Sequence, residues 1–110
     1  MSTLRILCYI RGDDYKQAFE VKIREDEDVG TLRKYIKAKK TPIFDHIPAD
    51  CIVLWAVNIL FDENIKENVD KLGLVDGKSL LPFMRLSKVF SDVSDGYLHI
   101  VVKDLLIGEY

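Results

Sequence analysis

The stretch IPADCIVLWAVNILF (residues 47–61) constrains the fold more than any other part of this chain. From Val53 to Ile59, apolar side chains follow one another almost without a break. A strand with one face in water alternates apolar and polar residues, whereas this strand is apolar on both faces. Either the chain itself or a partner must therefore cover two faces of this strand.

The segments before this strand predict a β-hairpin followed by a helix. Residues 3–10 and 18–25 both alternate, and the turn signal RGDD lies between them. Apolar residues then recur at helical spacing from Val29 to Ile36, and Asp28 just before them is a suitable N-cap.

The segments after the apolar strand predict shorter elements and a final strand. Residues 62–73 fit a short helix that ends at Gly73, and residues 82–90 fit a helical turn. Residues 97–103 are expected to form the last strand. A helix between a hairpin and a later strand lies across one face of a sheet. The order therefore predicts an α+β domain with a mixed sheet of four to five strands and one main helix.

Length and charge limit the functional classes. The 110 residues suffice for one domain, and a formal charge of −2 argues against a dedicated nucleic-acid binder. No stretch approaches the roughly 18 consecutive apolar residues of a membrane-spanning helix. Cys8 and Cys51 both lie in predicted strands, so they are expected to be free, partly buried thiols rather than a disulfide framework.

No group of residues predicts catalysis. Neither His46 nor His99 has a nucleophile or an acid at a recognisable spacing, and no phosphate loop or zinc-ligand spacing occurs. The sequence therefore predicts a non-enzyme without catalytic residues, metal or cofactor. An enzyme hypothesis, such as a hydrolase using Cys51, would require one abnormally reactive thiol.

Two segments resemble ubiquitin. IPADCIVLW is similar to the loop and strand that carry the exposed isoleucine of ubiquitin, and YLHIVVK (97–103) is similar to its last strand. On this resemblance, Trp55, His99 and Val101 fall at the positions of the ubiquitin binding patch. The resemblance implies a ubiquitin-like β-grasp fold.

Five segments in order resemble the N-terminal domain of the Crinkler effectors of oomycetes and fungi. They are VGTLRKYIKAKK, IPADCIVLWAV, FDENIKENVDKLG, LPFMRLSKVF and HIVVK. Oomycete members carry Leu-Phe-Leu-Ala-Lys about where this chain has LWAVN (54–58), so a fungal-type member fits better. The resemblance implies an N-terminal module over residues 1–104, and residues 105–110 would begin the linker to a C-terminal effector region. It also implies secretion and delivery into a host cell, with the host nucleus as a destination, although no signal peptide is visible.

The β-grasp interpretation predicts that the apolar strand leaves one face open. Leu54 and Ala56 would point towards the helix, as would Leu98, Ile100 and Val102 on the last strand. The opposite face is the predicted protein-interaction site, because exposed apolar patches mark binding surfaces and Trp and Tyr are enriched in hot spots. Its residues are Leu7, Tyr9, Val53, Trp55, Val57, Tyr97, His99 and Val101. In the alternative interpretation, residues 80–95 fold over this face and Trp55 belongs to the core.

The function predicted from these features is a non-catalytic protein-interaction module at the head of a secreted effector. A second copy of the chain is the economical partner, because a two-fold homodimer needs one self-complementary patch or sheet edge. Host proteins are further partners, whereas nucleic acid and membranes are not expected to bind. The alternative is an intracellular ubiquitin-like adaptor that presents the same face to ubiquitin receptors or a small GTPase.

Overall fold

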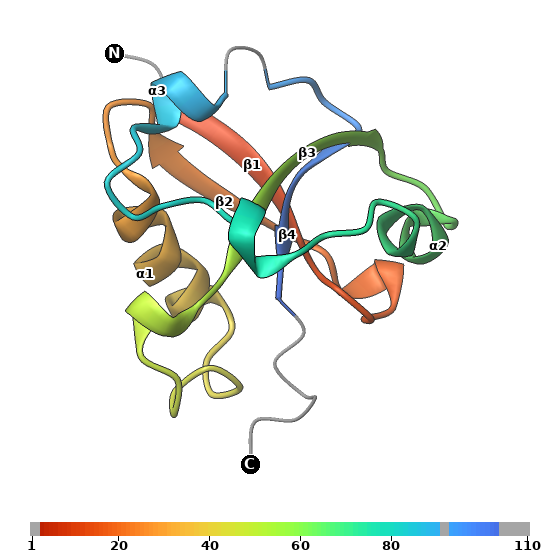
Figure 1. Cartoon of the computed structure of the whole chain (residues 1–110), viewed down its shortest axis with the longest axis horizontal. Helices are drawn as coiled ribbons and strands as arrows, with labels where there is room; N and C mark the ends of the chain where they lie inside the picture. Colours follow the sequence, from red (N-terminus) through yellow and green to blue (C-terminus); the bar gives the residue numbers. More distant parts are fainter. Residues whose placement is uncertain (1–2, 91–92, 104–110) are drawn as a thin grey trace.

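The computed structural model describes residues 3–90 and 93–103 and contains one mixed four-stranded sheet with the strand order β2-β1-β4-β3 (Figure 1). The central strands β1 and β4 are parallel, and the two outer pairs are antiparallel. The strands are β1 (Thr3–Ile10), β2 (Phe19–Arg24), β3 (Leu54–Leu60) and β4 (Tyr97–Val102). Together with the main helix α1 (Val29–Lys39), this sheet confirms the predicted α+β class and is compatible with a ubiquitin-like fold.

Short helices occupy the connections. Both helical segments predicted between β3 and β4 are present, although they are shorter than the sequence suggested. The short elements are η1 (Tyr15–Gln17), η2 (Ala49–Cys51), α2 (Ile65–Asp70), η3 (Asp76–Lys78) and α3 (Leu86–Val89). The predicted linker at 105–110 lies outside the described residues, so that domain boundary stays a prediction.

The helix α1 begins where the sequence predicts. The Asp28 carboxylate accepts a hydrogen bond of 2.8 Å from the Thr31 amide, as expected for an N-cap. Hydrogen bonds from the Thr31 amide and hydroxyl lower the pKa of this carboxyl. The amides of Val29 and Gly30 donate to the carbonyls of residues 84 and 82, at 2.9 and 3.0 Å. The first turn of α1 is therefore bound to a segment more than fifty positions later in the chain.

The first core lies between α1 and the sheet. The helix contributes Val29, Leu32 and Ile36, all of which are fully buried. Alternate residues of β1 and β2, such as Ile6 and Val21, face them as the alternation predicts. Residues 80–90 also join this core through Leu80, Leu86 and Phe90.

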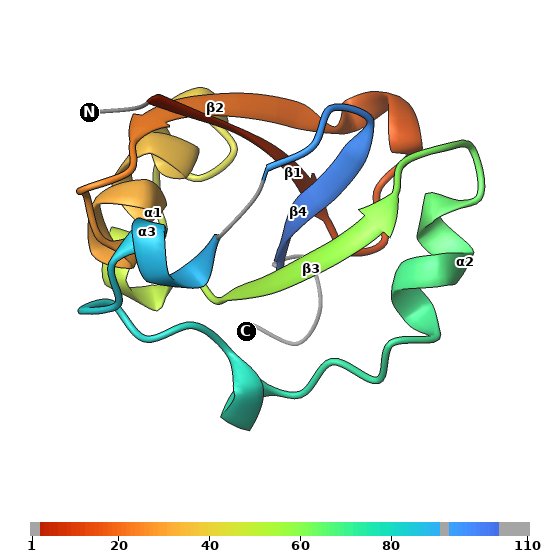
Figure 2. The same cartoon turned by 90° about the horizontal axis from the view of Figure 1, so that it is seen from above.

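The opposite face of the sheet is covered by α2 and the chain that follows it (Figure 2). Ile65 and Val69 of α2 pack in a second core with Trp55 and Tyr9. Trp55 is only 2% exposed, and its indole N–H donates to the Val75 carbonyl at 2.9 Å. The prediction that this face is open is therefore wrong.

The alternative prediction, that residues 80–95 cover the Trp55 face, is right that the face is covered but wrong about the covering segment. The face is covered, but residues 80–90 pack on the α1 side, and the cover comes from α2 and Leu74. The physical reason is that a strand apolar on both faces needs a cover on each. The apolar stripe of α2 was visible in the sequence, but its position relative to the sheet was not.

A β-bulge between β3 and β4 changes the side-chain alternation on β4. Ala56 pairs with Ile100 and Ile59 pairs with Leu98, so two residues of β3 lie opposite the single residue His99. Leu98 consequently packs in the second core, where the sequence placed it on the α1 side. Ala56, which was also expected to face α1, is exposed.

Replacement of Trp55 should destabilise the fold. A buried Trp truncated to Ala costs about 3–5 kcal/mol, because its apolar contacts are lost and a cavity remains. Trp55→Phe keeps most of the contacts but loses the bond to Val75, and we expect a loss of about 1 kcal/mol. Urea unfolding followed by circular dichroism measures both. A Trp55→Ala variant as stable as the parent chain would contradict the assignment of Trp55 to a core.

Candidate functional site

The predicted interaction face is an interior layer in the structure. Six of its eight residues contribute to the second core: Leu7, Tyr9, Val53, Trp55, Val57 and Val101. His99 is also buried, at 4% exposure, and only Tyr97 is exposed, at 37%. Since a partner can reach little of this layer, the accessible binding surfaces lie elsewhere.

The polar ends of the two large aromatic residues in this layer are satisfied inside the chain. The Tyr9 hydroxyl donates to the Asp13 carbonyl, and burial is the main reason that the pKa of Tyr9 rises to about 12. The guanidinium of Arg11 lies 5.5 Å from the centre of the Trp55 ring, within range of a cation–π interaction. These contacts are typical of core residues with satisfied polar tips.

His99 replaces a backbone group in the central strand pair. The Leu7 amide donates to His99 Nδ1 at 3.1 Å, where regular pairing with β4 would have continued. His99 Nε2 lies 3.1 Å from the Ser94 carbonyl. Because Nδ1 accepts this hydrogen bond, it carries no proton of its own. Nε2 therefore carries the proton and donates to the Ser94 carbonyl, so the ring is the neutral Nε2–H tautomer. The Phe90 ring packs edge-on against it, with centroids 6.4 Å apart.

The two cysteines have different surroundings. Cys8 is fully buried in β1, and burial raises the pKa of its thiol. Cys51 closes η2 and is exposed, so the prediction that both cysteines are partly buried strand residues is wrong for it. The strand begins three residues later because Ala49–Cys51 form a helical turn after Pro48. Neither cysteine forms a disulfide.

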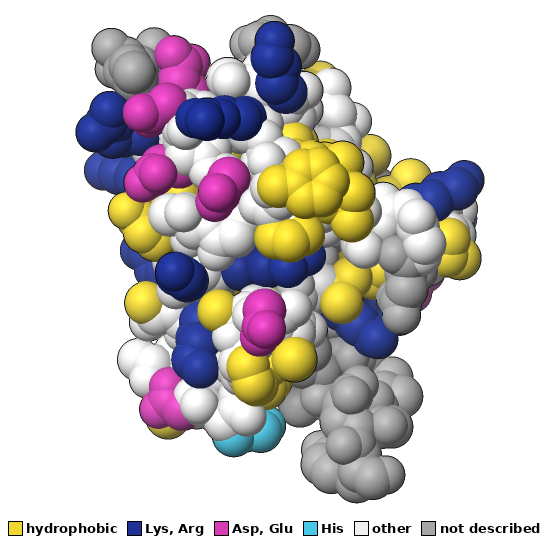
Figure 3. Space-filling model, turned by 60° about the vertical axis from the view of Figure 1, so that its left-hand side comes forward, with side chains coloured by type: hydrophobic (Ala, Val, Ile, Leu, Met, Phe, Trp, Pro, Cys, Tyr) yellow, Lys and Arg dark blue, Asp and Glu magenta, His cyan; other side chains and the backbone are white. Residues whose placement is uncertain are grey.

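Among the residues that the structure describes, the most exposed large apolar side chain belongs to Phe83, at 73% exposure. Its neighbour Leu81 is 46% exposed, and Pro82 between them is exposed as well. We call residues 81–83 the LPF segment. Figure 3 shows the side of the molecule that carries α1, where hydrophobic side chains gather in a patch bordered by acidic and basic groups.

The backbone of the LPF segment is held on both sides. The Leu80 amide donates to the Leu54 carbonyl at 2.8 Å, and the buried Arg33 donates to the Leu80 carbonyl at 2.9 Å. The Pro82 and Met84 carbonyls accept bonds from the first turn of α1. The apolar side chains are thus displayed from a fixed base.

The sequence signal for this surface was present but was assigned differently. The pattern of PFMRLSKVF predicts a helical turn with apolar residues for packing, and this holds for its second half in α3. In its first half, the backbone carbonyls are used to cap α1, so the Phe83 side chain is left outside. Periodicity alone does not reveal such long-range capping.

The described residues provide neither a metal cluster nor a membrane span. No group of three or more His, Cys, Asp or Glu side chains within residues 3–90 and 93–103 could hold a metal ion. No helix in the same residues is long and apolar enough to cross a membrane.

Comparison with known proteins assigns the family. Residues 4–103 match the family model described as the Crinkler effector protein N-terminal domain. The chain belongs to the Crinkler family. This Crinkler domain is 33% identical over 102 residues to Crinkler effector protein 1 of Rhizophagus irregularis, which confirms the predicted resemblance. The match covers 92% of the chain and 21% of that relative.

The family match bears on the predicted function only at a coarse level. It supports an effector role, and this N-terminal domain is not a known catalytic domain. The chain spans about one fifth of the length of the curated relative it matches. No solved structure matches the chain.

The stability of this Crinkler domain should fall as the pH falls below about 6.5. Burial lowers the pKa of His99 below its ordinary value of 6.5, against the opposing effects of the Ser94 carbonyl and Asp95. The unfolded chain therefore takes up a proton first as the pH falls, so the stability from this group is complete above 6.5 and lost below it. Urea midpoints at pH 7.5 and 5.5 measure the change.

Two variants test whether His99 causes the pH dependence. His99→Gln cannot take up a proton, so its urea midpoint should change less between the two pH values. His46→Gln alters an exposed turn residue and should leave the pH dependence as in the parent chain. An unchanged pH dependence in His99→Gln would refute the assignment.

Thiol labelling should show one accessible cysteine in the folded Crinkler domain. An aromatic disulfide reagent should react with Cys51 at the rate of an ordinary exposed thiol, and with Cys8 only in denaturant. Cys51→Ser should remove the reaction seen in the folded state, and Cys8→Ala should leave it. A Cys51 rate far above that of the denatured chain would instead favour the enzyme hypothesis.

Proposed function

We propose that this domain is a non-catalytic protein-interaction module that heads a Crinkler effector and self-associates through the LPF segment. The observation that carries the proposal is the 73% exposure of Phe83 on a backbone held by hydrogen bonds. Apolar patches of this kind mark interaction sites, and buried aromatic anchors dominate interface energies. A fixed base lowers the conformational entropy lost on binding.

A second copy of the chain is the partner. A two-fold dimer needs only one self-complementary patch, and exposed apolar side chains such as Phe83 and Leu81 can pack against their own copies. The patch replaces the Trp55 face, on which the sequence had placed self-association. The alternative function, an intracellular ubiquitin-like adaptor, required an open Trp55 face. Because α2 covers this face, the alternative loses its basis.

The setting of this activity follows from the family. The domain would form the N-terminal part of a secreted protein delivered into a host cell, with the host nucleus as its destination. The remaining four fifths of such a protein would carry the effector activity, as the coverage of the Rhizophagus irregularis relative suggests. Self-association of the N-terminal domain would place two effector regions side by side.

Phe83→Asp should weaken self-association by at least about thirty-fold, because a hot-spot aromatic contributes about 2 kcal/mol and the substitution is present in both copies. Light scattering over a concentration series of the purified chain measures the dissociation constant. The fold should be retained, since Phe83 lies outside both cores.

Ile43→Asp is the matched control. Ile43 is 56% exposed in the turn that follows the other end of α1, about 16 Å along the helix from its first turn. This variant should self-associate as the parent does. A parent chain that stays monomeric at every concentration would refute the proposal, and so would an equal effect of the two variants.

A further inference from the structure

The two edges of the sheet differ in their accessibility. On the β3 edge, the Leu54 carbonyl already accepts a bond from Leu80, and the chain from α2 to α3 runs alongside the strand (Figure 2). On the β2 edge, the described chain adds no further strand. Within residues 3–90 and 93–103, no backbone hydrogen bond joins residues 19–23 to any element other than β1.

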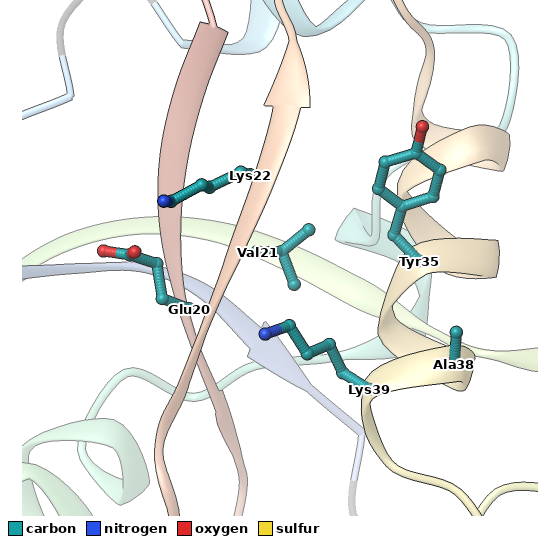
Figure 4. A pocket seen from close by; sticks show the side chains of 6 residues that line it. All are labelled: Glu20, Val21, Lys22, Tyr35, Ala38 and Lys39. Carbon is teal, nitrogen blue, oxygen red and sulfur yellow. The ribbon is translucent and has the colours of Figure 1, made fainter.

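A groove of about 640 Å³ lies between this open edge and α1 (Figure 4). Its lining residues are Glu20, Val21, Lys22, Tyr35, Ala38 and Lys39. Val21 points towards α1, where the exposed ring of Tyr35 and the methyl group of Ala38 form the apolar wall. Glu20 and Lys22 point to the side of β2 that faces away from α1. Lys39 extends from α1 towards β2.

The charges at the groove are not balanced. The Glu20 carboxylate lies 3.3 Å from the Arg5 guanidinium, so its charge is already paired on the sheet surface. Neither Lys22 nor Lys39 forms an ion pair within the described part of the chain. The groove therefore presents an open strand edge, an apolar wall and two unneutralised bases.

We infer that this groove binds an extended segment of a partner protein that pairs with β2 and carries alternating apolar and acidic residues. The backbone of the segment would continue the sheet, as in strand addition to an exposed edge. Its apolar side chains would lie towards Tyr35 and Ala38. Its acidic side chains would lie on the other side of the strand, opposite Lys22, where cross-strand pairs of opposite charge are favourable. The ammonium group of Lys39, which extends from α1 towards β2, adds a second positive charge near this edge.

A second copy of the chain fits this groove less well. Two β2 strands paired about a two-fold axis would bring both α1 helices to the same face of the joined sheet. Residues 29–40 carry five basic residues and no acidic one: Arg33, Lys34, Lys37, Lys39 and Lys40. The resulting repulsion disfavours this dimer, whereas an acidic segment is attracted. The inference concerns a partner other than the copy proposed for the LPF segment and stands independently of it.

The test is an NMR titration of the isotope-labelled chain with a six-residue peptide of alternating valine and glutamate. We expect saturable amide shifts confined to β2 and the second half of α1. The same peptide with alternate N-methylated backbone amides should bind at least about five-fold more weakly, since it cannot complete the strand pairing. A peptide of alternating valine and lysine should not bind.

Variants of the chain separate the groove from general charge effects. Lys22→Glu and Lys39→Glu should each weaken binding by about five-fold. Lys34→Glu is the matched control, because it makes the same charge change on α1 outside the groove, and it should leave binding unchanged. Phe83→Asp should also leave binding unchanged, and Lys22→Glu should leave self-association unchanged.

Several results would overturn the inference. They are the absence of saturable shifts, equal binding of the N-methylated peptide, or equal weakening by Lys34→Glu. Loss of self-association in Lys22→Glu, together with no peptide binding, would instead show that a second copy occupies the β2 edge.

Discussion

Trp55 joins the sheet to the chain that follows β3, and the accessible surfaces depend on that contact. Its ring packs in the second core with α2, and its indole N–H donates to the Val75 carbonyl. The chain leaving Val75 is thereby directed along β3 until Leu80 bonds to Leu54. From there it reaches the first turn of α1, where its carbonyls cap the helix and its side chains, including Phe83, remain in water.

Because the chain after Val75 runs along β3, the two edges of the sheet differ in their accessibility. The β3 edge is partly bonded and interrupted by the bulge opposite His99, whereas the β2 edge has no strand beyond it in the described chain. An open edge is a liability unless charge or an intended partner controls it. Lys22 on β2 and Lys39 on α1 supply a charge that discourages a basic neighbour and favours an acidic one. The apolar LPF segment and the charged groove are thus suited to different partners.

Local patterns in the sequence predicted most of the elements. The alternation of residues 3–10 and 18–25 and the Asp28 cap correspond to features of the structure. The short helix α2 ends at Asp70, before the predicted stop at Gly73. The errors arose where the result depended on distant residues. Leu98 lies on the other side of the sheet because of a bulge. The sequence predicts an exposed Trp55, because the apolar stripe of α2 does not reveal where α2 packs. Cys51 was placed in a strand that begins only after a helical turn.

The sequence by itself determined the α+β class, the main helix and the family, because these depend on local periodicity and on the order of short segments. It also determined that the apolar strand needed two covers. Only the tertiary structure decided which segments supply them, because burial depends on contacts between residues far apart in the chain. As a result, the accessible apolar surface lies at Phe83 and not at Trp55, and β2, rather than β3, is the open edge of the sheet.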